Sequence, residues 1–127
     1  MKLNLALVSM ARTTTFFLLA VAFTANVNAM SLRQLRALVQ SDENGETYAL
    51  YYMVGAMEGA VEAHMHDVRQ GAKPAICLDG GRLEPRLARA LLDTELQRNA
   101  GMYEADMPVQ FVMTAALLNT YPCKVAP

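Results

Sequence analysis

The sequence predicts an all-α protein, a small four-helix domain with one intrachain disulfide. Apolar residues recur three and four positions apart in four segments, as one face of a helix requires, and breaks rich in Gly, Pro and Asp separate these segments. No convincing segment alternates apolar and polar residues with the period of two that a β-strand would show. The chain of 127 residues is long enough for one domain and contains two cysteines, Cys77 and Cys123.

Residues 1–29 are predicted to be a secretory signal peptide. Their uninterrupted apolar run, Phe16–Phe23, follows the positive charge of Arg12, and small residues then lead to a cleavage site after Ala29. The alternative is a membrane anchor, but the run is too short for the roughly 20 residues of a span. Met10 is an alternative start of translation, because the apolar stretch before it is unusual in a signal peptide.

The charge of residues 30–127 limits the classes of partner. Lys2 and Arg12 are the only charged residues before this segment, so nine of the 11 basic and all 12 acidic residues lie within it, a net charge of −3. A nucleic-acid binder needs a cationic surface that displaces counterions, so we expect no nucleic-acid partner. The segment is too apolar for a disordered chain, and it contains no run long enough to span a membrane.

Export would place Cys77 and Cys123 in an oxidising compartment, where an even number of cysteines in a small domain predicts a disulfide. Closing a loop of this length stabilises a fold by roughly 4 kcal/mol in the chain-entropy model. The alternative is a nucleophilic cysteine paired with His64 or His66, but no thiolate-stabilising residues surround Cys77. We therefore expect a structural disulfide and no catalytic residue.

The first two predicted helices are separated by a polar turn. Ser31 is typical of an N-cap, and apolar residues follow it at helical spacing as far as Val39. The turn-forming residues Ser41–Gly45 then end this short helix. A longer helical pattern runs from about Thr47 to Arg69.

Prolines mark the expected starts of the third and fourth helices. Pro85 suits the first turn of a helix whose apolar face extends to Leu96. Asp106 is expected to cap the last helix, with Pro108 in its first turn, and Pro122 is expected to end it. The two cysteines then lie in the loop before the third helix and directly after the fourth.

The second helix carries the one set of residues that suggests a metal site, namely Glu62, His64, His66 and Asp67. Glu62 and His66 are four positions apart and share a face, whereas His64 points elsewhere. Zinc needs three or four converging ligands, and the sequence suggests no third. We therefore expect a solvated helix face, with no metal and no cofactor.

Gly55 and Gly59 lie four positions apart on one face of the same helix. Each glycine destabilises a helix by roughly 1 kcal/mol, so a compensating benefit is implied. We expect these glycines to serve helix packing by letting another helix of the domain approach closely, with contact to a ligand as the alternative.

Residues that bind a partner are expected on the second helix and in the loop that holds the first cysteine. The tyrosines at 48, 51 and 52 cluster within one helical turn and cannot all face one core, and aromatic side chains are enriched at interfaces. A disulfide would hold the loop rigidly, which suits recognition, although a plain connector is the alternative. The partner-binding candidates are Tyr48, Tyr51, Asp79, Gly80, Gly81 and Arg82.

Three segments carry a resemblance to a known family. They are Tyr52–Gly59, with the pattern Tyr-x-x-Gly-x-x-x-Gly, then Ile76–Leu78 around the first cysteine, and Ala116–Cys123, which ends in aromatic-Pro-Cys. In combination they resemble the Rap/Tai family of periplasmic immunity proteins of type VI secretion, over nearly all of the chain after the signal. The two cysteines match the late cysteine pair of that family, but the additional early cysteine of many members is missing.

This resemblance implies an all-helical, disulfide-stabilised protein that is commonly a homodimer. Its partner would be a cognate secreted peptidoglycan hydrolase, an amidase effector injected by neighbouring bacteria, whose active cleft it binds and occludes. Catalysis then belongs to the partner, and this chain contributes a binding surface.

A small periplasmic acid-stress chaperone is the alternative function. Chaperones of that class share the size, the disulfide and a related helical pattern. Protonation of carboxylates would dissociate a dimer and expose apolar surface to client proteins at about pH 2 to 3. The immunity protein is instead expected to form a tight one-to-one complex at neutral pH.

Overall fold

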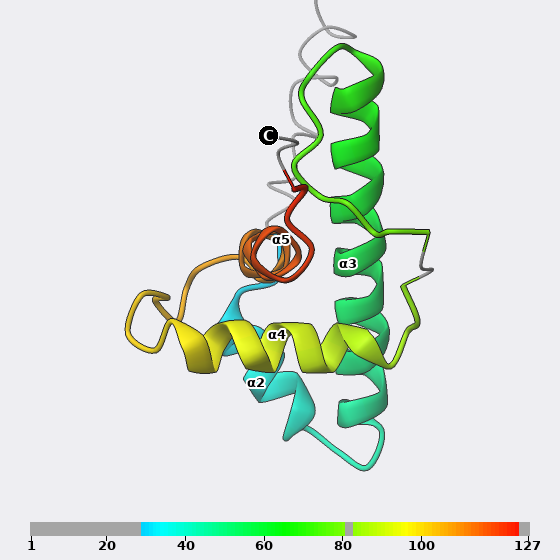
Figure 1. Cartoon of the computed structure of the whole chain (residues 1–127). Helices are drawn as coiled ribbons and strands as arrows, with labels where there is room; N and C mark the ends of the chain where they lie inside the picture. Colours follow the sequence, from blue (N-terminus) through cyan, green and yellow to red (C-terminus); the bar gives the residue numbers. More distant parts are fainter. Residues whose placement is uncertain (1–28, 81–82, 125–127) are drawn as a thin grey trace, which may run out of the picture.

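The computed structural model describes residues 29–80 and 83–124, and these form four α-helices and no β-strand (Figure 1). The helices are α2 (Leu32–Val39), α3 (Gly45–Arg69), α4 (Leu87–Arg98) and α5 (Val109–Thr120). The predicted all-α, four-helix fold is therefore confirmed. The proposed signal peptide falls almost entirely outside the described residues, and none of the helices within them is both long and apolar enough to cross a membrane.

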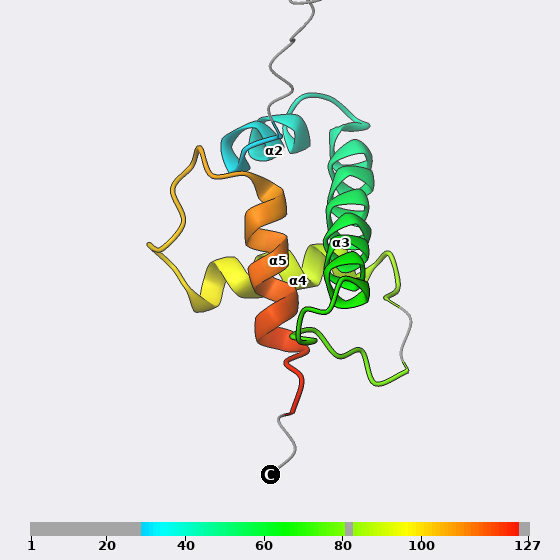
Figure 2. The same ribbon diagram turned by 90° about the horizontal axis from the view of Figure 1, so that it is seen from above.

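The long helix α3 is the element to which the other three attach. In Figure 1, α5 is seen end-on beside α3, and α4 crosses below it. Seen from above, α2 lies at one end of α5 (Figure 2). Helix α5 contacts both α3 and α4, while α2 contacts α3. The buried side chains at this junction include Leu32, Leu35, Ala49, Met53, Ala56, Met57, Leu91, Leu92, Val109, Val112, Met113, Ala116 and Leu117.

Helix α2 begins at a capping box, as the N-cap prediction for Ser31 required. The Ser31 hydroxyl accepts a hydrogen bond from the backbone of Gln34, whose side chain accepts one from the Ser31 backbone. The next free N–H group, that of Leu32, donates to the carbonyl oxygen of Met107 at 3.0 Å. This bond ties the start of the domain to the segment before α5.

Helix α3 begins at Gly45, two residues before the expected start. Gly45 is buried, and a Cβ atom at this position would collide with the backbone oxygen of Leu38. A glycine therefore lets the first turn of α3 close against the end of α2.

The predicted starts of α4 and α5 are wrong in detail. Pro85 lies in a turn, and α4 begins two residues later at Leu87. Asp106 does not cap α5, because its carboxylate accepts a hydrogen bond from the Arg33 guanidinium at 3.2 Å. Pro108 occupies the N-cap position with an extended backbone (ψ 136°), so the helix starts after this residue.

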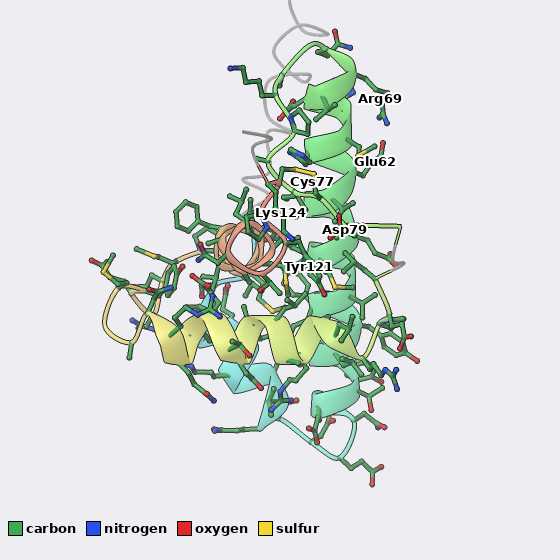
Figure 3. All side chains as sticks on the ribbon, in the orientation of Figure 1. Glu62, Arg69, Cys77, Asp79, Tyr121 and Lys124 are labelled. Carbon is green, nitrogen blue, oxygen red and sulfur yellow. A yellow bond between two sulfur atoms is a disulfide. The ribbon has the colours of Figure 1, made fainter. Side chains whose placement is uncertain are left out.

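The predicted disulfide between Cys77 and Cys123 is confirmed. It joins positions 46 residues apart, with the two Cα atoms at 4.8 Å. The Cys77 N–H donates to the Tyr121 carbonyl at 2.8 Å, and the Cys123 N–H donates to the Ala75 carbonyl at 3.2 Å. Figure 3 shows Cys77 close to Tyr121, where α5 ends. The bond and the backbone contacts together hold the loop after α3 against the end of the chain.

Candidate functional site

The described surface is hollowed where α5 passes α3, and we call this hollow the α3/α5 groove. Its volume is about 600 Å³, and no charged residue lines it. The lining residues are Tyr51, Tyr52, Gly55, Ala56, Gly59, Ala60, Ala63, Gln110 and Thr114. A second hollow of about 320 Å³ shares Gln110 and Thr114 and continues over Phe111, Ala115 and Leu118 of α5. The two hollows together form one uncharged strip.

The two glycines of α3 lie open on the groove wall. Gly55 and Gly59 are exposed, and a Cβ atom at either position would have no heavy atom within 4 Å outside its own helix. The prediction that they let another helix of the domain approach is therefore wrong for the part of the chain that the structure describes. Packing among the described residues therefore does not compensate their destabilisation of the helix.

Large aromatic side chains stand exposed on and beside the strip. The exposed fraction is 70% for Tyr51, 61% for Phe111 and 54% for Tyr48. The surface position expected for at least one of the clustered tyrosines is confirmed, and Tyr51 lines the groove. Phe111 is one of the apolar residues of α5 (Val109–Thr120), yet it lies exposed. Because apolar residues occur on all sides of α5, the spacing did not distinguish its exposed face.

Polar atoms lie at the floor of the groove. The Tyr52 hydroxyl accepts a hydrogen bond from the Met30 N–H at 3.0 Å and another from the Gln110 amide nitrogen at 2.5 Å. The amide oxygen of Gln110 is buried and has no hydrogen-bond partner among the described residues. Buried acceptors are normally satisfied, so this oxygen is an exception among the described residues.

The structure does not unite the loop candidates with the tyrosines in one site. Asp79 and Gly80 are exposed and adopt left-handed backbone conformations, with φ of 42° and 76°. Neither residue lines the α3/α5 groove or its continuation over α5. The other two candidates, Gly81 and Arg82, lie outside the described residues.

A buried carboxylate joins α4 to α5, and sequence reasoning missed it. Glu95 is 2% exposed and accepts hydrogen bonds from Asn99 (2.7 Å), Tyr103 (2.5 Å) and Asn119 (3.0 and 3.1 Å). Burial raises the pKa of Glu95, but these hydrogen bonds and the charge of Arg98 outweigh burial, so the net shift is downward. Burial, the hydrogen bond to Glu95 and the charge of Glu95 raise the pKa of Tyr103 to about 12. The cluster is enclosed, which suits a role in stability.

The residues considered as a metal site make other contacts. Glu62 pairs with Arg69 at 2.7 Å, and both side chains point outward near the end of α3 (Figure 3). The Nε2 atom of His64 accepts hydrogen bonds from the backbone N–H groups of Ala75 and Ile76 at 3.3 and 3.2 Å. His64 therefore anchors the loop after α3 and is not simply solvated. In residues 29–80 and 83–124, no three side chains of the ligand types gather closely enough to hold a metal ion.

Comparisons with models of protein families, with curated proteins and with solved structures found no match to this chain. Membership of the immunity family therefore stays a prediction that rests on the sequence resemblance. The fold, the disulfide and the α3/α5 groove stand independently of that resemblance.

Proposed function

We propose that this chain is a periplasmic immunity protein that binds and inhibits a secreted peptidoglycan hydrolase, an amidase effector of type VI secretion. The observation that carries the binding role is the α3/α5 groove, an uncharged strip with exposed aromatic side chains and two glycines that no described part of the chain covers. Exposed apolar surfaces of this kind mark interaction sites. The choice of a cell-wall hydrolase as the partner rests on the family resemblance.

The groove suits a protruding helix or loop of the partner enzyme. Gly55 and Gly59 have no side chains, so a partner backbone would approach α3 closely. Tyr51 and Phe111 would contribute apolar contact area. Inhibition then requires no chemistry and no cofactor from this chain, because the bound domain covers the cleft of the enzyme.

Export to the periplasm and a homodimeric free state belong to the same proposal. The Cys77–Cys123 disulfide supports export, because such bonds persist in oxidising compartments. Light scattering on the purified protein measures the mass of the free state, and a monomer would remove the dimer from the proposal while leaving the inhibitory role intact.

The function is tested first by the neighbouring gene, which should encode a secreted cell-wall hydrolase, and then by co-expression with that hydrolase. Growth should be restored only when this protein carries its export signal, and the purified pair should form a one-to-one complex at neutral pH. If the exported protein neither binds the hydrolase nor protects the cells, the proposed function is wrong.

Two substitutions on α3 test the position of the interface. Gly59→Leu fills the groove, and the open space at this position lets the domain itself accept the side chain. It should abolish binding and protection. Glu58→Leu adds the same side chain at an exposed position of α3 outside the groove, and it should preserve both. Unchanged binding by Gly59→Leu would exclude the groove as the interface without excluding the function.

The acid-stress chaperone is a second candidate, and the buried Glu95 favours it. Protonation of this carboxylate would weaken the contacts between α4 and α5 and so open the core. A chaperone should bind an apolar dye and prevent aggregation of a client protein at about pH 3. An unchanged dimer that binds no dye in acid contradicts this candidate.

A further inference from the structure

The chain contains two places where asparagine or aspartate directly precedes glycine, namely Asn44–Gly45 and Asp79–Gly80. Such pairs rearrange without an enzyme, because glycine has no side chain to keep its backbone nitrogen away from the side-chain carbonyl carbon of the preceding residue. The reaction needs a peptide bond that is free to rotate. The fold therefore decides which of the two pairs reacts.

The fold holds the peptide bond of Asn44–Gly45 at both of its polar atoms. The Asn44 carbonyl accepts a hydrogen bond from the Tyr48 N–H at 3.0 Å, and the Gly45 N–H donates to the Asp42 carbonyl at 3.1 Å. Gly45 is also buried where α3 begins. Rotation of this peptide bond toward the Asn44 side chain would break both hydrogen bonds, so the folded protein protects this pair.

The peptide bond of Asp79–Gly80 lies in an exposed turn. Both residues are exposed and belong to no helix, and their φ angles of 42° and 76° are left-handed, which residues with a side chain seldom adopt. Among residues 29–80 and 83–124, the Asp79 carbonyl and the Gly80 N–H form no hydrogen bond with another backbone group. A Cβ atom on Gly80 would have no heavy atom within 4 Å outside its chain neighbours, so open space surrounds this residue.

We propose that Asp79 is a site of spontaneous backbone modification, at which aspartate converts to isoaspartate through a succinimide. The Gly80 nitrogen bonds to Cγ of Asp79, and the carboxyl hydroxyl leaves with the amide hydrogen as water. Water then opens the ring at the main-chain carbonyl, which gives isoaspartate, or at Cγ, which restores aspartate.

The product has the same atoms as the original chain, but its main chain runs through Cβ and Cγ of residue 79. The main chain is therefore one atom longer, and the carboxylate is attached directly to it, two residues after the disulfide-bonded Cys77. The inference is independent of the proposed inhibitory function, because neither Asp79 nor Gly80 lines the α3/α5 groove.

Asp79→Asn allows one reaction to be compared at two positions, because the variant chain contains two Asn–Gly pairs. Asparagine forms the same ring by releasing ammonia, and mass spectrometry of peptides detects the carboxylate that hydrolysis leaves. In the folded variant at neutral pH, position 79 should react at least about tenfold faster than Asn44, which must first lose two hydrogen bonds. In urea with reductant the two rates should become similar. Circular dichroism checks that the variant is folded.

The wild-type protein provides a second test without a substitution. At about pH 5, where a fraction of an ordinary aspartate is protonated and can lose water, the folded protein should accumulate isoaspartate at Asp79 about as fast as the unfolded chain. The isoaspartyl peptide has an unchanged mass and is separated by chromatography. Two outcomes would overturn the proposal. One is no isoaspartate at Asp79 in the folded protein under conditions in which the unfolded chain forms it. The other is a reaction at position 79 of folded Asp79→Asn that is no faster than the reaction at Asn44.

Discussion

Replacing the buried Glu95 by glutamine should destabilise the domain more than the same change at an exposed glutamate. Oε1 of Glu95 accepts hydrogen bonds from Asn99, Tyr103 and Asn119, and Oε2 accepts another from Asn119. A glutamine in the same rotamer keeps its oxygen toward the three donors at Oε1. It turns an amide donor toward Asn119 in place of Oε2, and it removes the negative charge.

The expected loss in the free energy of unfolding follows from the number of side chains that donate to the Glu95 carboxylate. A hydrogen bond to a charged group contributes about 1 kcal/mol more than a neutral one, so three donors give a loss of about 3 kcal/mol. Glutamine avoids the burial of a charge, which offsets part of that loss and leaves about 2 kcal/mol. Glu95→Ala removes both acceptor oxygens and leaves a buried cavity beside its three former donors, so we expect a loss of about 4 kcal/mol.

The effect should depend on pH with a definite sign. The pKa of Glu95 in the folded protein is lowered from its ordinary value of 4.5, because its hydrogen bonds and Arg98 outweigh burial. Its ionisation therefore contributes stability above pH 4.5, and that contribution is lost as the pH falls through the folded-state pKa. The difference between the wild type and Glu95→Gln should accordingly shrink in acid.

Urea unfolding followed by circular dichroism measures the free energy of unfolding of the wild type and of Glu95→Gln. The measurement is made at neutral pH and at several values below pH 4.5. Glu104→Gln is the matched control, because Glu104 is exposed, and it should change the free energy of unfolding by less than about 0.5 kcal/mol. Equal stability of Glu95→Gln and the wild type at neutral pH would refute the reasoning. So would a difference that stays constant or grows as the pH falls.

Three further changes should alter the free energy of unfolding in urea. Gly59→Ala should raise it by about 1 kcal/mol, because alanine favours the helix and meets open space, whereas a decrease would contradict the open position. Gly45→Ala should lower it by about 2 kcal/mol, because the added Cβ collides with Leu38, and unchanged stability would show that the turn relaxes freely. Reduction of Cys77–Cys123 should lower it by about 4 kcal/mol for a separation of 46 residues, and an equal midpoint with and without reductant would exclude a stabilising role.

The four helices were predictable because their signals act within a few residues of chain. The capping residue Ser31 and the apolar spacing depend on neighbours along one helix, and the structure confirms both. The errors arise where a contact outside the helix itself decides the conformation. Asp106 pairs with Arg33, 73 positions away, and Gly45 starts a helix because its missing side chain leaves room for Leu38. Rules that consider only the residues of one helix include neither contact.

The candidate site could be predicted only in part for the same reason. The sequence identified Gly55 and Gly59 as unusual in a helix, but spacing alone does not say what faces them. The core face of α3 runs through Met53, Ala56 and Met57. Gly55 is rotated by about 100° from Ala56 around the helix axis, which places it on the flank of that face.

The position of these glycines on the flank, and not on the core face, changes how the pattern is interpreted. For a glycine on the core face, close packing within the domain compensates the destabilisation of the helix, and an alanine in its place would clash with the neighbouring element. On the open flank of α3, alanine at Gly59 would stabilise the free domain. Stability alone does not account for glycine here, whereas the close approach of the proposed partner would. A single variant can therefore separate folding from binding. Gly59→Leu should leave the domain folded but abolish its binding to the proposed partner, whereas a substitution in the core would alter both.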